Sequence, residues 1–183
     1  MAAYIELRSR HGMSAEAAEG TFLLAELILQ SKRNDREDAA RSLFSEIPTM
    51  QPSSPWAPRA LVRRAALEDR ARLRVVDPML AVAVPASLVT YRQIVESYPN
   101  TEAVESSLSR LADMYEDLRR YDLAALALLD LARKFPLDPS DAAWRAGELF
   151  EKRIKDLQRA RDAYTLVPPR SPHYRDAQKK LQP

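Results

Sequence analysis

The chain has 183 residues, of which 46% are hydrophobic and 30% charged, a composition that fits a folded protein and excludes a disordered one. The formal net charge of +2 gives no strong electrostatic preference, and the lack of cysteine excludes disulfides, thiol catalysis and thiolate metal sites. Only 3 glycines occur, whereas Ala, Leu, Arg and Glu dominate, which favours an all-α fold.

Apolar residues at helical spacing predict a series of helices separated by short connections. In chain order, helices are expected at 14–31, 36–47, 57–74, 86–97, 101–118, 122–134, 140–153 and 157–167, followed by a last helix at 173–181. Residues 1–13 form an N-terminal segment or a partial helix in this reading. No apolar run approaches the roughly 20 residues of a transmembrane helix.

The segment 75–85, VVDPMLAVAVP, is an apolar insertion between two of these helices. Loops of such length often carry function, so the insertion is expected either to dock a partner or to pack back on the chain. Its polarity is too low for a freely solvated linker, which favours packing back.

A four-residue signature recurs along the helices. A small residue is followed four positions later by an aromatic or large apolar residue, three further on by an aliphatic residue, and five beyond that by proline. The sets are Ala40, Phe44, Ile47 and Pro52; Ser87, Tyr91, Ile94 and Pro99; Ala124, Leu128, Leu131 and Pro136; Ala160, Tyr164, Val167 and Pro172. Offsets of four and three put the first three members on one helix face, and proline ends the helix.

A second motif of small and apolar residues, such as Leu111-Ala112 and Ala146-Gly147, precedes the signature by about a dozen residues. Each unit is therefore helix, turn, helix, proline, and the last two units repeat at 36 or 37 residues. Self-similarity at this period is typical of a helical solenoid, in which stacked helix pairs share one core.

The period and the closing proline resemble the tetratricopeptide repeat (TPR). The strings Tyr98-Pro99-Asn100-Thr101 and Tyr121-Asp122-Leu123-Ala124 are most similar to the bacterial TolA-binding and outer-membrane assembly lipoprotein type of repeat. The turn glycine usual before the second helix is missing from every unit. The resemblance implies an all-α solenoid of about four helix pairs over 14–172, divided as 14–52, 53–99, 100–136 and 137–172, with 173–183 as a capping helix.

The resemblance also implies a non-catalytic scaffold that binds a peptide or protein segment in a concave groove, with bacterial envelope assembly as a setting. The first helix of each pair would line this groove through Phe22, Glu26, Arg59, Val62, Ser109, Asp113, Glu116, Trp144, Glu148 and Glu151. Trp144 is expected either to anchor the partner or to pack against a neighbouring helix pair. The acidic third and fourth units would suit a basic or mixed peptide.

Catalysis, a cofactor and a metal site are not expected, because the chain holds only His11 and His173 and no glycine-rich phosphate loop. One alternative is an anionic-ligand binder, for RNA or a membrane surface, that uses Arg63, Arg70 and Arg74 on helix 57–74. Another is an oligomerisation or regulatory module of a larger protein.

The expected partner is a protein or peptide, with no small-molecule substrate, and a nucleic acid is expected only under the RNA alternative. Membrane association is expected only through a segment outside this chain. The expected compartment is the periplasm or outer membrane if a signal has been removed, and otherwise the cytoplasm.

Overall fold

The computed structural model describes residues 15–137 and 141–182, so the predicted N-terminal segment 1–13 lies outside the described residues. The described chain is helical apart from one two-stranded hairpin, which confirms the all-α fold class in its main feature. It divides into two compact units, Met1–Ala103 and Val104–Pro183.

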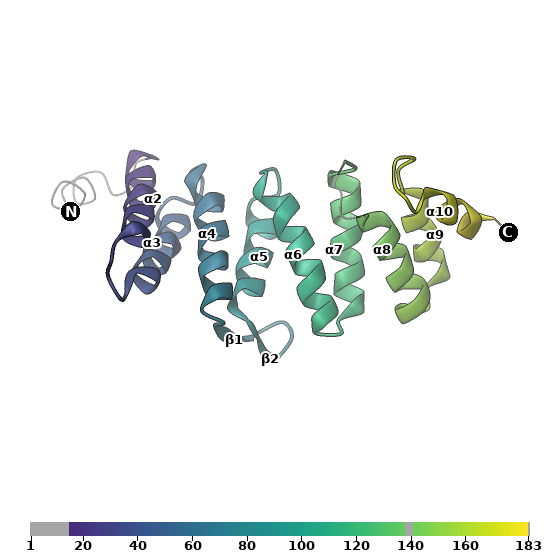
Figure 1. The fold of residues 1–183 in the computed structure, drawn as a ribbon, viewed down its shortest axis with the longest axis horizontal. Helices are drawn as coiled ribbons and strands as arrows, with labels where there is room; N and C mark the ends of the chain where they lie inside the picture. The colour runs from purple at the N-terminus through teal and green to yellow at the C-terminus, as the bar shows by residue number, and fades with distance from the viewer. Residues whose placement is uncertain (1–14, 138–140, 183) are drawn as a thin grey trace. The chain divides into compact units, whose positions relative to one another are not determined.

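The first unit contains four described helices, each of which packs against the next along the chain (Figure 1). They are α2 (Ala15–Gln30), α3 (Arg36–Met50), α4 (Trp56–Arg70) and α5 (Ala86–Ser97). All four lie where the apolar spacing predicts them, within a few residues at each end. Proline falls inside two of them: Pro58 lies in the first turn of α4, where its missing N–H is tolerated, and Pro48 lies in the last turn of α3.

The core of the first unit is built from the signature residues. Ala40, Phe44 and Ile47 are at most 1% exposed, and they line the side of α3 that meets its neighbours. Phe22 of α2 adds an aromatic contact on each side, with ring centroids 5.2 Å from Phe44 and 4.9 Å from Trp56. The signature therefore predicts the buried helix face correctly.

The expected helix 57–74 is too long by four residues, because α4 ends at Arg70. Arg72 adopts a left-handed conformation with φ of 51°, and the Leu73 N–H donates back to the Glu68 carbonyl at 3.0 Å. This closure turns the chain out of the helix. Strand β1 (Arg74–Asp77) follows and pairs antiparallel with β2 (Val82–Pro85), so that Val75 faces Val84.

The hairpin is the main departure from the sequence prediction, which contained no strand. The expectation that segment 75–85 packs back on the chain holds for Val84, which is fully buried, and is wrong for Val76, Met79 and Val82, which are exposed. Figure 1 shows the hairpin projecting at one end of α4 and α5. A short run rich in valine favours a strand, and the surrounding helical pattern outweighed this signal.

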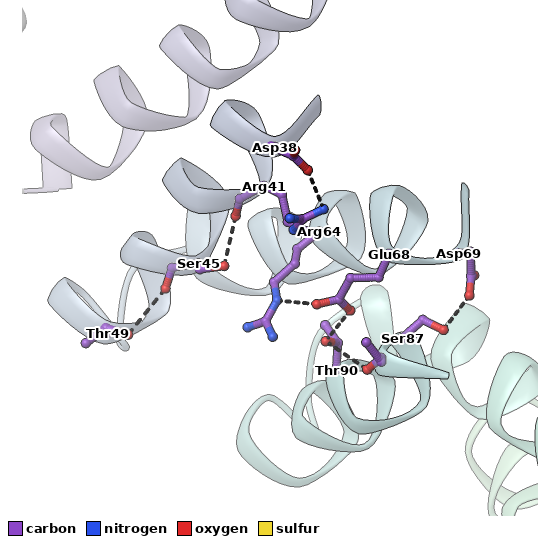
Figure 2. A network of polar contacts seen from close by, with 10 residues as sticks. Asp38, Arg41, Ser45, Thr49, Arg64, Glu68, Asp69, Ser87 and Thr90 are labelled. Carbon is purple, nitrogen blue, oxygen red and sulfur yellow. Dashed lines mark hydrogen bonds and ion pairs between the residues drawn. The ribbon is translucent and has the colours of Figure 1, made fainter. Parts of the chain in front are cut away.

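A polar network joins α4 to α5 beside this core (Figure 2). The buried Glu68 carboxylate accepts hydrogen bonds from Arg64 Nε and Thr90 Oγ1, both at 2.7 Å. The next residue, Asp69, accepts from the Ser87 hydroxyl. Because a buried carboxylate is costly unless it is paired, these bonds fix the register of the two helices.

The second unit contains α6 (Ala103–Asp117), α7 (Tyr121–Lys134), α8 (Ala142–Leu149), a π-helical turn η1 (Phe150–Ile154), α9 (Leu157–Thr165) and α10 (Tyr174–Leu181). Successive helices from α7 to α10 pack against each other. The signature residues Ala124, Leu128 and Leu131 of α7 are fully buried. Those of the last set, Ala160, Tyr164 and Val167, are at most 4% exposed.

Cationic side chains adopt the left-handed conformation at two turns between helices. Arg119, between α6 and α7, has φ of 56°, and Lys155, between η1 and α9, has φ of 67°. At each turn the following N–H returns to the helix, from Arg120 to the Tyr115 carbonyl at 2.8 Å and from Asp156 to the Phe150 carbonyl at 2.9 Å. Both turns thus keep a left-handed closure without the glycine that favours it.

Candidate functional site

The groove residues expected in the first unit mostly contact other side chains of that unit. Glu26 of α2 and Arg63 of α4 form a two-point ion pair, with Arg63 Nε–Oε1 at 2.5 Å and NH2–Oε2 at 2.8 Å. Phe22 lies between two core aromatic rings. Val62 is partly buried. The Glu26–Arg63 pair and the Phe22–Trp56 contact join α2 to α4.

The expected basic face of residues 57–74 is neutralised along most of its length. Arg70 pairs with Glu37 of α3 at 2.9 Å. Arg59 lies 5.3 Å from the Trp56 ring centroid and 3.8 Å from the Glu102 carboxylate. Arg74 belongs to β1 rather than to a helix, so the stripe of Arg63, Arg70 and Arg74 is not continuous. The expectation of one basic stripe on a single helix 57–74, on which the alternative of RNA or membrane-surface binding depended, is therefore wrong.

In the second unit, two expected groove residues share one cation. Arg145 of α8 donates to Asp113 and to Glu116 of α6, each at 2.7 Å. Burial alone would lower the pKa of the Arg145 guanidinium, but these two hydrogen bonds raise it above its ordinary value. The cluster fixes α8 against α6. Ser109, one turn before Asp113, is partly buried.

Trp144 packs within its own unit. Its ring stacks on His173 at 4.8 Å with an interplanar angle of 5° and meets the Tyr164 ring at 5.1 Å. The indole thus packs on α9 of its own helix pair and on the start of α10 rather than on a neighbouring pair, and it stays partly exposed. Its expected role as a partner anchor stays a prediction.

Glu151 is also held by its neighbours. Its carboxylate accepts from Lys180 Nζ at 2.5 Å and from the Tyr164 hydroxyl at 2.6 Å, and in that order these bonds lower the pKa of the Glu151 carboxyl. Burial, followed by the hydrogen bond to Glu151, raises the pKa of the Tyr164 hydroxyl. Glu151 therefore secures α10 to the end of α8 and carries a structural ion pair.

An open cleft lies where α6 ends, α7 begins and α8 runs into η1. It encloses about 390 Å³ and is lined by Glu116, Asp117, Tyr121, Glu148, Leu149, Lys152 and Arg153. Glu116 and Glu148 are expected groove residues, and the fold brings them to one opening. Glu148 accepts a hydrogen bond from Lys152, and the Arg153 guanidinium lies 5.1 Å from the centroid of the Tyr121 ring.

Sequence reasoning missed Asp117, Tyr121 and Arg153 as candidate site residues. In the sequence, Tyr121 stands out only as part of a repeat motif. The available signal is its position, since an aromatic residue at the start of a helix beside a tight turn is well placed to line a cleft. Arg153 is placed by the π-helical turn, which has one residue more than an α-turn and redirects the side chains that follow. No pattern of apolar spacing predicts that turn.

Among residues 15–137 and 141–182, no group of three or more His, Cys, Asp and Glu side chains could hold a metal ion. Within the same ranges, every helix is too short or too polar to cross a membrane. Comparison with known protein families and with curated proteins finds no match for this chain.

Proposed function

We propose that this chain is a non-catalytic interaction scaffold, built like a TPR array, that binds a peptide or protein segment in the cleft between α6, α7 and α8. The observation that carries the proposal is the meeting of Glu116 and Glu148 at one open cleft of about 390 Å³. That volume lies in the range of small ligand sites, about 300–1,000 Å³, and suits a few side chains of an extended segment.

The cleft favours a ligand that carries a basic side chain next to an apolar one. Its lining contains three carboxylates, from Glu116, Asp117 and Glu148, and two cations, from Lys152 and Arg153. Glu116 and Glu148 already hold basic partners, whereas Asp117 is exposed at the rim. A ligand lysine or arginine would therefore meet Asp117 first.

Tyr121 supplies a second contact. Its ring already holds one guanidinium, that of Arg153, at a distance typical of a cation–π interaction. The buried signature residues and the sequential helix packing support the TPR-like reading of the scaffold. TPR-like arrays present such clefts on rigid helix pairs, which lowers the ordering cost of binding.

A displayed library of random peptides, selected against the full chain, tests the proposal. Selected peptides should be enriched in Lys or Arg beside an apolar residue. Their affinity, measured by fluorescence anisotropy, should fall about tenfold or more with Asp117→Lys or Glu148→Lys, because each reversal places a positive charge against the ligand cation.

Asp130→Lys is the matched control, since Asp130 is an exposed carboxylate on α7 outside the cleft lining. It should leave the affinity unchanged. If no peptide is enriched, or if the selected peptides bind all three variants equally, the cleft is not the binding site and the proposed function fails.

A further inference from the structure

The hairpin presents an apolar tip that the first unit leaves uncovered. Val76 is 73% exposed, Met79 54% and Val82 50%. Pro78 and Ala81, in the turn between the strands, are exposed as well. Side chains directly opposite each other in an antiparallel pair lie on the same face, so the pairs Val76–Ala83 and Asp77–Val82 put Val76 and Val82 on opposite faces of the hairpin. Apolar side chains are therefore exposed on both faces of the projecting hairpin (Figure 1), and several such residues together mark an interaction surface.

The tip is held in one conformation by Asp77. Its carboxylate is fully buried and accepts from the N–H groups of Met79 at 2.7 Å and Leu80 at 2.9 Å. Arg92 of α5 donates to its other oxygen at 2.6 Å. This anchor fixes the turn to the helices, so the apolar side chains are displayed without an ordering cost at the moment of binding.

Two exposed arginines, Arg72 and Arg74, lie where the chain enters the hairpin, and the exposed Asp69 and the Arg70–Glu37 pair precede them. The segment 70–85 contains three arginines, Arg70, Arg72 and Arg74, and one acidic residue, Asp77, whose charge is buried against Arg92. All three arginines are exposed. Arg70 shares its charge with Glu37, while Arg74 donates to the Ala83 carbonyl and so keeps its full charge. The exposed side chains of the segment thus combine an apolar tip with a basic base.

We propose that the hairpin inserts its tip into a lipid surface that carries anionic headgroups. Burial of Val76, Met79 and Val82 among the acyl chains would remove their apolar surface from water. Arg72 and Arg74, set back from the tip, would then lie at the depth of the headgroups, where each basic residue adds to binding. The segment contains no aromatic residue on which a nucleic-acid base could stack, which disfavours RNA.

This inference is independent of the cleft. It also revises the expectation that only a segment outside this chain would meet a membrane. The tip would act as a peripheral attachment, and a single short apolar tip gives weak, reversible binding that depends on the anionic lipid.

Because the chain contains no cysteine, a single introduced cysteine is the only residue that a thiol-reactive fluorophore will label. Met79→Cys, labelled with an environment-sensitive fluorophore, is titrated with phosphatidylcholine vesicles that do or do not contain phosphatidylserine. Emission should shift to the blue and intensify only with phosphatidylserine, and the shift should weaken as salt screens the headgroups. The same label on Leu157→Cys, at a residue 65% exposed in the second unit, should not respond.

Substitutions then test the apolar tip and the basic base of the hairpin separately. In the labelled chain, Val76→Asp should weaken vesicle binding by at least about tenfold, because it places a charge in the apolar tip. Arg72→Asn, which keeps a residue that tolerates the left-handed conformation, should weaken binding about fivefold. Leu157→Asp is the control and should bind as the parent does.

Circular dichroism of each variant shows whether the helices persist, so a loss of binding by folded protein supports the proposal. An unresponsive label at position 79 with anionic vesicles overturns it, and so does unchanged binding by Val76→Asp. A response to RNA alone, or to protein concentration without lipid, would instead make the hairpin a nucleic-acid or self-association surface.

Discussion

The ring of Tyr164 on α9 lies against Gly147 on α8, in the space that a Cβ at position 147 would occupy. Tyr164 is 2% exposed, and its hydroxyl donates to Glu151 at 2.6 Å. The missing side chain therefore sets how closely α8 and α9 approach. Both residues belong to the repeat pattern. The small residue of one helix therefore makes room for the large residue of the next.

Gly147→Ala should destabilise the second unit. Replacing a glycine inside a helix with alanine ordinarily stabilises it by about 0.5–1 kcal/mol. At this position the new methyl overlaps the Tyr164 ring, and overpacking costs about 1–3 kcal/mol, so a net loss of about 1–2 kcal/mol is expected. Urea unfolding is followed by Trp144 fluorescence in a Trp56→Phe background, which reports on the second unit because the chain has only 2 tryptophans.

A double-mutant cycle with Tyr164→Leu supplies the control. The smaller side chain should remove most of the penalty of Gly147→Ala, with a coupling energy of about 0.5–3 kcal/mol. Equal penalties in the two backgrounds would show that the Tyr164 ring does not limit the approach of the helices.

Arg119→Gly should stabilise the second unit. Arg119 adopts a φ of 56°, which costs a residue with a Cβ about 1–2 kcal/mol and costs glycine almost nothing. Glycine gives back part of this gain through its greater freedom in the unfolded chain, so about 0.5–1 kcal/mol should remain. The same Trp144-reported urea unfolding measures it.

Arg110→Gly is the matched control for that substitution, because Arg110 is an exposed arginine inside α6. It should lose about 1 kcal/mol. A loss of stability in Arg119→Gly would mean that the arginine side chain contributes more at the turn than its strained backbone costs.

The sequence predicted the helices well because apolar spacing reports which face of each helix is buried. All twelve non-proline signature residues, Phe44 and Tyr164 among them, are buried. It failed at segment 75–85, where a short apolar run rich in valine forms a hairpin although helices surround it on both sides. It also gave no warning that Arg119 and Lys155 would take the left-handed turns, because charged residues rarely adopt that conformation.

Acid should weaken the first unit through Asp77. Burial raises the pKa of this carboxyl, but the hydrogen bond from Arg92 and those from the Leu80 and Met79 N–H groups outweigh burial and lower the pKa below its ordinary value. The pair therefore contributes stability that is present above the unfolded pKa of about 4 and is lost as pH falls through the lower folded pKa.

Asp77→Asn removes the titrating carboxyl and so isolates its contribution to the free energy of unfolding. It should cost about 3 kcal/mol at neutral pH, because the largely buried Arg92 loses the charge of Asp77, and it should flatten the acid dependence. Urea unfolding at neutral and acid pH, followed by Trp56 in a Trp144→Phe background, measures both effects. An acid dependence as steep as that of the parent would assign the titration to other carboxylates.

The candidate site was harder to predict than the fold. The repeat pattern predicts which face of a helix a residue lies on, but not which other side chain that residue will pair with. Glu26 was expected to face a ligand, but it is bound by Arg63. Asp113 is likewise taken up by Arg145. Partners separated by some 30 residues or more along the chain are brought together by helix stacking, which spacing within one helix cannot reveal.

Trp144→Ala should reduce the stability of the second unit and leave the cleft intact. The indole stacks on His173 and meets Tyr164, and removing a buried tryptophan costs about 3–5 kcal/mol. Because Trp144 is only partly buried, a loss of about 2–3 kcal/mol is expected, measured by urea unfolding followed by circular dichroism. Peptides selected for the α6–α7–α8 cleft should bind the folded variant with parental affinity, because Trp144 is not among the cleft-lining residues. The opposite pattern, in which binding is lost while stability is unchanged, would restore Trp144 as a ligand anchor and would require that the His173 stack open to admit the partner.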